Sequence, residues 1–204
     1  MSITGPSRLD YPTSGVLPIA LGANSFASNW LISQFAARLV KKEYVCLCEG
    51  AGMTVGEVGT ISSPLLTEEV GETLVTRVSP LGREARTEYT VTDSFAQPAP
   101  ATEDQRLSLL KVRLLTGRTH QIRVHLASIG QPLVGDRTYG NRQGLPCVRM
   151  FLHCHKVSFR NFEGSILEAV AQLPRELQVL LDSLGRDAQK MPRSPFGLPF
   201  LKNF

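Results

Sequence analysis

Alternating apolar and polar residues along the chain predict a series of strands. In residues 43–48, Val45 and Leu47 fall on one face of a strand, and Tyr44 and Cys46 fall on the other. Five more segments show this alternation or a short apolar run between turn residues, and we expect strands there as well: 15–22, 58–61, 85–91, 107–115 and 150–159.

Apolar residues spaced three or four apart predict three helices. The first begins at a cap formed by Asn24 or Ser25 and runs to about Val40, with Lys41 and Lys42 at its C-terminal end. The same spacing predicts the other two helices over residues 119–130 and 174–184.

The order of these elements predicts an α+β fold. Strands and helices follow one another without regular βαβ alternation, which favours a mainly antiparallel mixed sheet with flanking helices. We expect one domain, residues 1–190, followed by a tail that contains Pro and Phe, residues 191–204.

Composition limits the class of protein. The 204 residues are 42% hydrophobic and 20% charged, which is typical of a globular protein. We expect no membrane span, because no apolar run reaches about 18 residues. The start of the chain lacks the features of a signal peptide, and four Cys do not suggest a disulfide framework, so we expect an intracellular protein.

Charge permits a polyanionic partner. The net charge is +4, and residues 111–123 contain four cations and one His without an acid. Such a local excess would neutralise phosphates of RNA, although it is also compatible with a basic face that contacts only solvent.

Two polar segments are candidates for chemistry. Asp10 lies two residues after Arg8 on a predicted turn. A carboxylate at such a position can act in catalysis, cap the turn or contact only solvent. The second segment, residues 117–123, opens the second helix with Thr119 as its predicted N-cap. Free N–H groups at a helix start attract anions, so we expect this segment to bind phosphate. The same residues could bind phosphate alone or also take part in catalysis.

Side chains of the second helix divide between two faces. His120 and Arg123 are three residues apart and share one face, whereas Gln121 and His125 are four apart and share another.

Several motifs resemble those of RNA pseudouridine synthases of the RluA type. Residues 117–126 (GRTHQIRVHL) and 130–140 (GQPLVGDRTYG) resemble the long signature of that family. Shorter matches occur in the same order as in the family, from about Arg8 to Leu184: 8–17 (RLDYPTSGVL), 41–44 (KKEY), 82–89 (GREARTEY) and 152–153 (LH).

The resemblance implies the fold of that family and an isomerisation of uridine in rRNA or tRNA to pseudouridine. Asp10 would be the catalytic carboxylate, Arg123 would pair with it, Tyr44 would stack on the target base, and Arg8 would fill the space that the extruded nucleotide leaves. The other residues implied to bind RNA are Arg118, Thr119, His120, Gln121 and His125. The reaction implies no cofactor and no metal, and we expect a monomer.

The chain departs from the family pattern near its start. Ser7 stands where the family has His, and Pro18 stands where it prefers an apolar strand residue. Family members carry strands before the catalytic motif, so we expect that this chain is a fragment, lacks a sheet edge or receives one from another chain.

Three other functions stay open at this point. One is an RNA-binding module that keeps the fold without activity. Another is a metal site using Cys46, Cys48 and residues 153–155 (HCH), although their spacing is unlike that of zinc knuckles. The third is glycosidic hydrolysis, for which Asp136 would be the second carboxylate, but its surroundings suggest a turn residue.

Overall fold

The computed structural model describes residues 3–50, 53–96, 106–141 and 144–184. Its elements, in chain order, are β1 (Ile3–Thr4), β2 (Ser14–Gly15), β3 (Ala20–Leu21), α1 (Phe26–Ala36), β4 (Lys41–Glu49), β5 (Val58–Ile61), β6 (Leu65–Val70), β7 (Thr73–Val78), β8 (Thr87–Ala96), β9 (Arg106–Leu114), α2 (Gln121–Ser128), β10 (Leu152–Arg160), β11 (Ile166–Val170) and α3 (Arg175–Ser183). None of the helices within these ranges is long and apolar enough to cross a bilayer.

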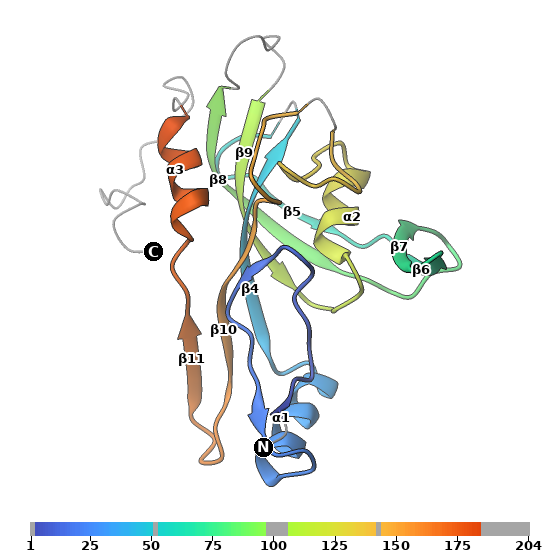
Figure 1. The fold of residues 1–204 in the computed structure, drawn as a ribbon, viewed down its shortest axis with the longest axis vertical. Coiled ribbons are helices and arrows are strands. Elements are labelled where there is room, and N and C mark those ends of the chain that lie inside the picture. The colour runs from blue at the N-terminus through green and yellow to red at the C-terminus, as the bar shows by residue number, and fades with distance from the viewer. Residues whose placement is uncertain (1–2, 51–52, 97–105, 142–143, 185–204) are drawn as a thin grey trace.

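A seven-stranded sheet forms the centre of the molecule (Figure 1). Six strands follow the order β11-β10-β4-β9-β8-β5, and β2 is attached to β10. Every pairing along that order is antiparallel, and only the short β2–β10 pairing is parallel. The predicted α+β class with a mainly antiparallel sheet is confirmed.

Strand β4 lies inside this sheet and is buried on both faces. Tyr44 and Cys46 point into one apolar cluster, while Val45 and Leu47 point into another, as the alternation in the sequence predicts. Each face of the sheet therefore has its own apolar core, and each core must be shielded from solvent by a different element.

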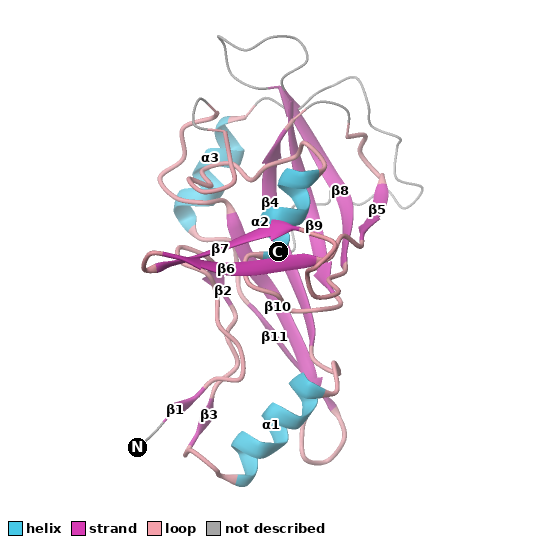
Figure 2. Cartoon of the chain, turned by 90° about the vertical axis from the view of Figure 1, so that its right-hand side faces the viewer, coloured by secondary structure: helices cyan, strands magenta, loops and turns pink. Residues whose placement is uncertain are grey.

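Helices α2 and α3 cover opposite faces of the sheet (Figure 1). Ile122 and Leu126 of α2 pack in the cluster that contains Tyr44. Leu177 and Leu181 of α3 pack in the cluster that contains Leu47. Helix α1 and the β1–β3 pair lie together at one end of the molecule, away from α3 (Figure 2).

The first helix is shorter than predicted. Ser25 caps it as expected, accepting a hydrogen bond from the Ser28 amide at 3.1 Å, but the helix ends at Ala36. Arg38 then adopts a left-handed conformation, with φ of 57°, which ends the helix and turns the chain toward the sheet. Lys41 and Lys42 consequently belong to β4 and do not lie at a helix end.

One further prediction is corrected, and the structure contains an edge strand outside the predicted set. The strand expected over residues 15–22 is reduced to the short pieces β2 and β3, and Pro18, which has no amide hydrogen to donate, lies between them. Strand β11 was not predicted, because it is an edge strand whose apolar side chains, including Ile166 and Val170, are largely exposed. The predicted tail at residues 191–204 lies outside the described residues.

Gly15 allows β2 to approach β10 closely. Its φ is +117°, a conformation that side chains disfavour, and a Cβ built on it would lie 2.1 Å from the Cys154 carbonyl oxygen. The amide of Val16 donates to that same oxygen at 2.9 Å. Residue 15 therefore has to be glycine for the loop that carries Asp10 to be attached to the sheet.

We predict that Gly15→Ala destabilises the protein by at least about 2 kcal/mol, because it adds both backbone strain and a clash with backbone atoms. Urea unfolding followed by circular dichroism measures this loss. Gly164→Ala is the matched control, since Gly164 also has a positive φ but has open space around it. Equal losses in the two variants would mean that the close approach to β10 contributes nothing.

Candidate active site

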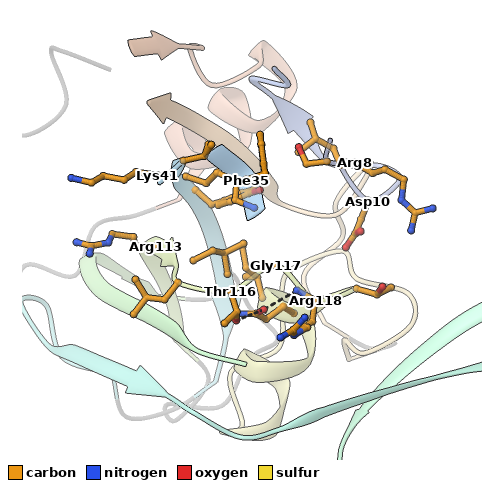
Figure 3. Close-up of a pocket in the computed structure, with 18 of the residues that line it drawn as sticks. Arg8, Asp10, Phe35, Lys41, Arg113, Thr116, Gly117 and Arg118 are labelled. Carbon is orange, nitrogen blue, oxygen red and sulfur yellow. Dashed lines mark hydrogen bonds between the residues drawn. The ribbon is translucent and has the colours of Figure 1, made fainter. Parts of the chain in front are cut away.

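A cavity of about 720 Å³ opens on the side of the sheet covered by α2. Four segments form its walls: the loop around Asp10, the end of α1, the start of β4 and the turn from β9 into α2. Among the described residues that line it, one is acidic, Asp10, and six are cationic: Arg8, Arg38, Lys41, Lys42, Arg113 and Arg118. Lys41 and Arg113 extend at one end of the cavity, and Asp10 lies toward the other (Figure 3). The cavity therefore combines a cationic wall with a single carboxylate.

Asp10 lies on a tight turn, as the sequence predicts. The Thr13 amide donates to the Asp10 carbonyl at 2.5 Å, and the Asp10 side chain is 28% exposed. One carboxylate oxygen lies 3.9 Å from Nη1 of Arg123. This separation permits electrostatic attraction but is too long for a hydrogen bond, so the carboxylate remains available to a ligand.

Arg123 has a closer partner than Asp10. Its Nε and Nη2 donate to the two carboxylate oxygens of Asp136 at 2.7 and 2.8 Å, and both side chains are almost fully buried. The predicted pairing of Arg123 with Asp10 is therefore the secondary contact, made by the remaining Nη1. A bidentate pair of this kind fixes the plane of the guanidinium as well as its position.

Asp136 is both a turn residue and an anchor. The amides of Thr138 and Tyr139 donate to its Oδ1 at 2.9 and 3.1 Å, in addition to the Arg123 contacts. Burial raises the pKa of Asp136, but the hydrogen bonds from Arg123 and from these amides outweigh burial and hold the pKa below its usual 3.8. The carboxylate is therefore ionised at neutral pH and balances the buried guanidinium.

Tyr139 holds Arg123 from the side. The Arg123 guanidinium lies over the Tyr139 ring, with its carbon 4.8 Å from the ring centroid. The Tyr139 hydroxyl accepts from the Thr76 amide at 2.8 Å and lies 2.9 Å from Nδ1 of His120. His120 is thus joined to a structural cluster next to the cavity, and burial followed by the charge of Arg123 lowers its pKa.

Gln121 is enclosed by hydrogen bonds that fix the start of α2. Its Oε1 accepts from the Thr116 hydroxyl and the Arg118 amide, and its Nε2 donates to the Arg86 carbonyl and the Thr87 hydroxyl, all within 3.0 Å. Gln121 lines the cavity wall, but its whole amide is used within the protein. It therefore positions neighbouring groups and offers little to a ligand.

His125 is fully buried on the same face of α2. Its Nδ1 lies 2.8 Å from the Thr87 hydroxyl, and its Nε2 lies 2.9 Å from the Ser63 carbonyl oxygen. Both ring nitrogens are occupied and shielded, so the predicted contact of His125 with RNA is corrected to a structural role. The shared face of Gln121 and His125 is real, and it faces the sheet.

The predicted N-cap of α2 also changes. His120, not Thr119, is the N-cap residue; it has a φ of 52° and makes no capping hydrogen bond with its side chain. The side chain of Gln121 satisfies the Arg118 amide instead. Thr119 is left to line the cavity together with Arg118, whose Nε donates to the Glu84 carbonyl.

Tyr44 and Lys42 reach the cavity from neighbouring positions on one face of β4. Tyr44 is 6% exposed, and burial, followed by the nearby Cys154 thiol and Asp10, raises its pKa well above 10. Lys42 lies 5.6 Å from the centroid of the Phe35 ring, and burial lowers its pKa. Within the described ranges Lys42 forms no ion pair, so no carboxylate neutralises its charge at the cavity wall, where it contacts the Phe35 ring.

The cysteines and histidines considered for a metal lie in the core. Cys46 and Cys48 are buried in the apolar cluster, and burial raises the pKa of Cys154 to about 11. His153 and His155 both lie within 3.0 Å of the Ala171 carbonyl oxygen. Over the described part of the chain, no three His, Cys, Asp or Glu side chains gather as a metal site.

The chain matches a family model over residues 5–128, which include Asp10, Tyr44 and Arg123. That model describes RNA pseudouridylate synthases. The chain belongs to the RNA pseudouridylate synthase family.

Relatives within this family share the sequence over most of the chain. An uncharacterized RNA pseudouridine synthase of Chloroflexus aurantiacus is 40% identical over 179 residues, covering 87% of this chain and 52% of the relative. Ribosomal large subunit pseudouridine synthase D of Haemophilus influenzae is 33% identical over 194 residues, covering 88% of this chain and 55% of the relative. The chain thus spans about half the length of these relatives.

A solved structure from the same family has a similar fold. Human RNA pseudouridylate synthase domain containing 1 superposes with a TM-score of 0.74 at 26% identity, covering 91% of this chain and 75% of the human chain. The sequence-based identification of the family and its fold is confirmed.

Sequence reasoning missed two residues of this candidate site. The sequence indicates Asp136 as a turn residue rather than the second carboxylate of a glycosidase, and it indicates no role for Tyr139 beyond its place in the 130–140 motif. Residues 135–140 (GDRTYG) do carry a signal, because an acidic and an aromatic residue follow a turn glycine. Nothing in the sequence, however, shows that Asp136 and Tyr139 contact Arg123.

We predict that Asp136→Asn lowers the free energy of unfolding by about 3–5 kcal/mol, because it leaves a buried guanidinium without its counter-charge. Chemical denaturation at pH 7 measures the loss. Glu68→Gln is the matched control, since it breaks an exposed ion pair with Arg77, which contributes at most about 1 kcal/mol.

The same pair gives a pH dependence with a defined sign. The folded-state pKa of Asp136 lies below 3.8, so its stabilising contribution is present above that pH and is lost as pH falls through the folded pKa. The Asn variant should lack this part of the acid destabilisation. Parallel acid-stability curves for the wild type and the variant would contradict the assignment.

Proposed function

We propose that this chain isomerises uridines in RNA to pseudouridine, with Asp10 as the catalytic carboxylate and without a cofactor. One observation carries the proposal: Asp10 is the single acid among the described lining residues of a cationic cavity, and it lies beside the fixed guanidinium of Arg123. Family membership supports the same reaction.

The charge around the cavity suits an RNA strand. Six lining cations surround one carboxylate, which favours a ligand that carries several negative charges. Cations that contact phosphates displace bound counterions, so binding should weaken steeply as salt rises. Arg8, Arg38, Lys42 and Arg118 are the cations we expect to contact RNA around the target nucleotide.

The size of the cavity suits an extruded nucleotide. Its volume of about 720 Å³ falls within the usual range for small-ligand pockets, about 300–1,000 Å³. A uridine stacked in RNA cannot reach Asp10, so the target must leave its stack. Tyr44 forms part of the cavity wall and offers an aromatic ring against which the base can stack.

The reaction balances without any added reactant. The C1′–N1 bond of the target uridine breaks, the base turns, and a new bond joins C1′ to C5. The proton on C5 is released and N1 gains one, so no electrons are exchanged with a cofactor. Asp10 either adds to C1′ or removes a proton from the sugar, and both roles require the ionised carboxylate. Nη1 of Arg123 places a positive charge 3.9 Å from the Asp10 carboxylate.

The named relative suggests a class of substrate. A ribosomal large subunit pseudouridine synthase is 33% identical to this chain, which makes ribosomal RNA the first substrate to test, with tRNA next. An inactive RNA-binding module is the competing function, and the first experiment below separates the two.

We predict that Asp10→Asn abolishes the release of tritium from cellular RNA labelled at uridine C5, because a neutral amide can replace neither role of the carboxylate. The dissociation constant for RNA should stay within about threefold of the wild-type value. Asp182→Asn, on the exposed surface of α3, is the control and should keep full activity.

Each outcome decides between the proposals. Tritium release by Asp10→Asn at the wild-type rate would exclude Asp10 as the catalytic group. A wild-type protein that binds RNA but releases no tritium would favour the inactive module. A large loss of RNA affinity in Asp10→Asn would assign Asp10 to binding or structure.

We also predict that Lys42→Met weakens RNA binding and reduces the slope of log K against log salt by about one, as expected when one phosphate contact is lost. Lys111→Met is the matched control, because Lys111 lies outside the cavity and pairs with Glu43 at 3.0 Å. Salt titrations of RNA binding measure both. Equal slopes for Lys42→Met and the wild type would mean that Lys42 does not contact a phosphate.

A further inference from the structure

Arg149 lies behind the turn that carries Asp10, outside the cavity lining. Its Nη1 donates to the Pro12 carbonyl oxygen and its Nη2 to the Ser14 hydroxyl, both at 2.8 Å. Its Nε donates to Glu176 of α3 at 3.1 Å. The Arg149 side chain is 15% exposed, so a largely buried guanidinium connects α3 to the two residues that immediately flank Thr13.

A second set of hydrogen bonds continues from Ser14 into the sheet. Because an arginine can only donate, the Ser14 oxygen accepts from Arg149, and its own hydrogen is free for Nδ1 of His153 at 2.9 Å. Nε2 of His153 then donates to the Ala171 carbonyl at 3.0 Å. This direction requires neutral His153, and burial, the largest influence, lowers its pKa.

The Arg149 contact with Pro12 is separate from those that attach β2 to the sheet, whereas Ser14 belongs to β2 and pairs with His153 of β10. Strand β2 is held by its pairing with β10 and by the hydrogen bond from the Val16 amide to the Cys154 carbonyl. Arg149 reaches Pro12, which lies between Asp10 and β2. Its contact with Pro12 therefore bears on where the turn lies relative to Arg123, while the strand pairing attaches the loop to the sheet.

We infer that Arg149 is a positioning residue for Asp10, acting through Pro12 and Ser14, with His153 supporting Ser14. The inference rests on the proposed function. The Asp10 carboxylate makes no hydrogen bond to Arg123 at 3.9 Å, so the turn itself has to hold it in place. Misplacing a catalytic group by about 1 Å costs on the order of 100-fold in rate.

The test compares Arg149→Met with Glu176→Gln, using single-turnover pseudouridine formation and RNA affinity as separate readouts. Arg149→Met should lower the rate at least about 30-fold with the dissociation constant within about threefold, because Arg149 positions Asp10 without touching RNA. Glu176→Gln leaves the contacts to Pro12 and Ser14 intact, and its rate should stay within about threefold of the wild type.

Two further variants cover the possibility that Arg149→Met does not fold. Arg149→Lys keeps the charge but cannot bridge both acceptors, and Ser14→Ala removes one of them, so each should lower the rate while preserving RNA affinity. The inference would be overturned if folded Arg149→Met has a rate near that of the wild type. If Arg149→Met does not fold, wild-type rates in both Arg149→Lys and Ser14→Ala would overturn it. A loss of RNA affinity as large as the loss of rate in these variants would also overturn the inference.

Hydrogen exchange separates this inference from the proposed function. If the wild type is inactive on every RNA, the proposed function fails. Exchange at the Thr13 amide, which closes the Asp10 turn, still tests Arg149. Faster exchange there in Arg149→Met, with β10 unchanged, would support the positioning of the turn, and unchanged exchange would refute it.

Discussion

The buried ion pair between Arg123 and Asp136 is the constraint on which the cavity depends. Two charges removed from water must satisfy one another, so α2 and the 133–140 turn have to lie in one fixed relation. The bidentate geometry and the Tyr139 ring leave Nη1 of Arg123 directed toward Asp10. Arg123 therefore cannot turn freely toward a ligand, and its charge is in place before a ligand arrives, which is the arrangement that the proposed electrostatic catalysis would require.

The sheet brings distant parts of the chain to this pair. Strand β10 holds the Asp10 loop through β2 and pairs with β4, where Cys154 lies opposite Tyr44. Helix α2 packs on that same face of the sheet and supplies Arg123. The buried hydrogen bonds of Gln121 and His125 fix the helix start against β8, which places the turn from β9 at the cavity wall. Residues far apart in sequence thus meet because their strands are neighbours.

Much of this arrangement could be predicted from the sequence, and the failures have physical reasons. Alternation gave the two buried faces of β4, because each face packs in its own core. The shared face of Gln121 and His125 was found from helical spacing, but spacing alone does not tell whether that face meets RNA or the sheet. The role of Asp136 depends on a tertiary contact, and β11 carries no burial pattern because its side chains are exposed.

The most direct test is a crystal structure of the protein bound to a short RNA that contains 5-fluorouridine in place of a uridine that the protein is proposed to modify. The proposed function predicts the base out of its stack and against Tyr44 and the Asp10 carboxylate beside C1′ of its ribose, and the structure predicts Arg123 still bidentate to Asp136. A target base that remains stacked outside the cavity, or a ribose remote from Asp10 with the Arg123–Asp136 pair broken, would contradict it.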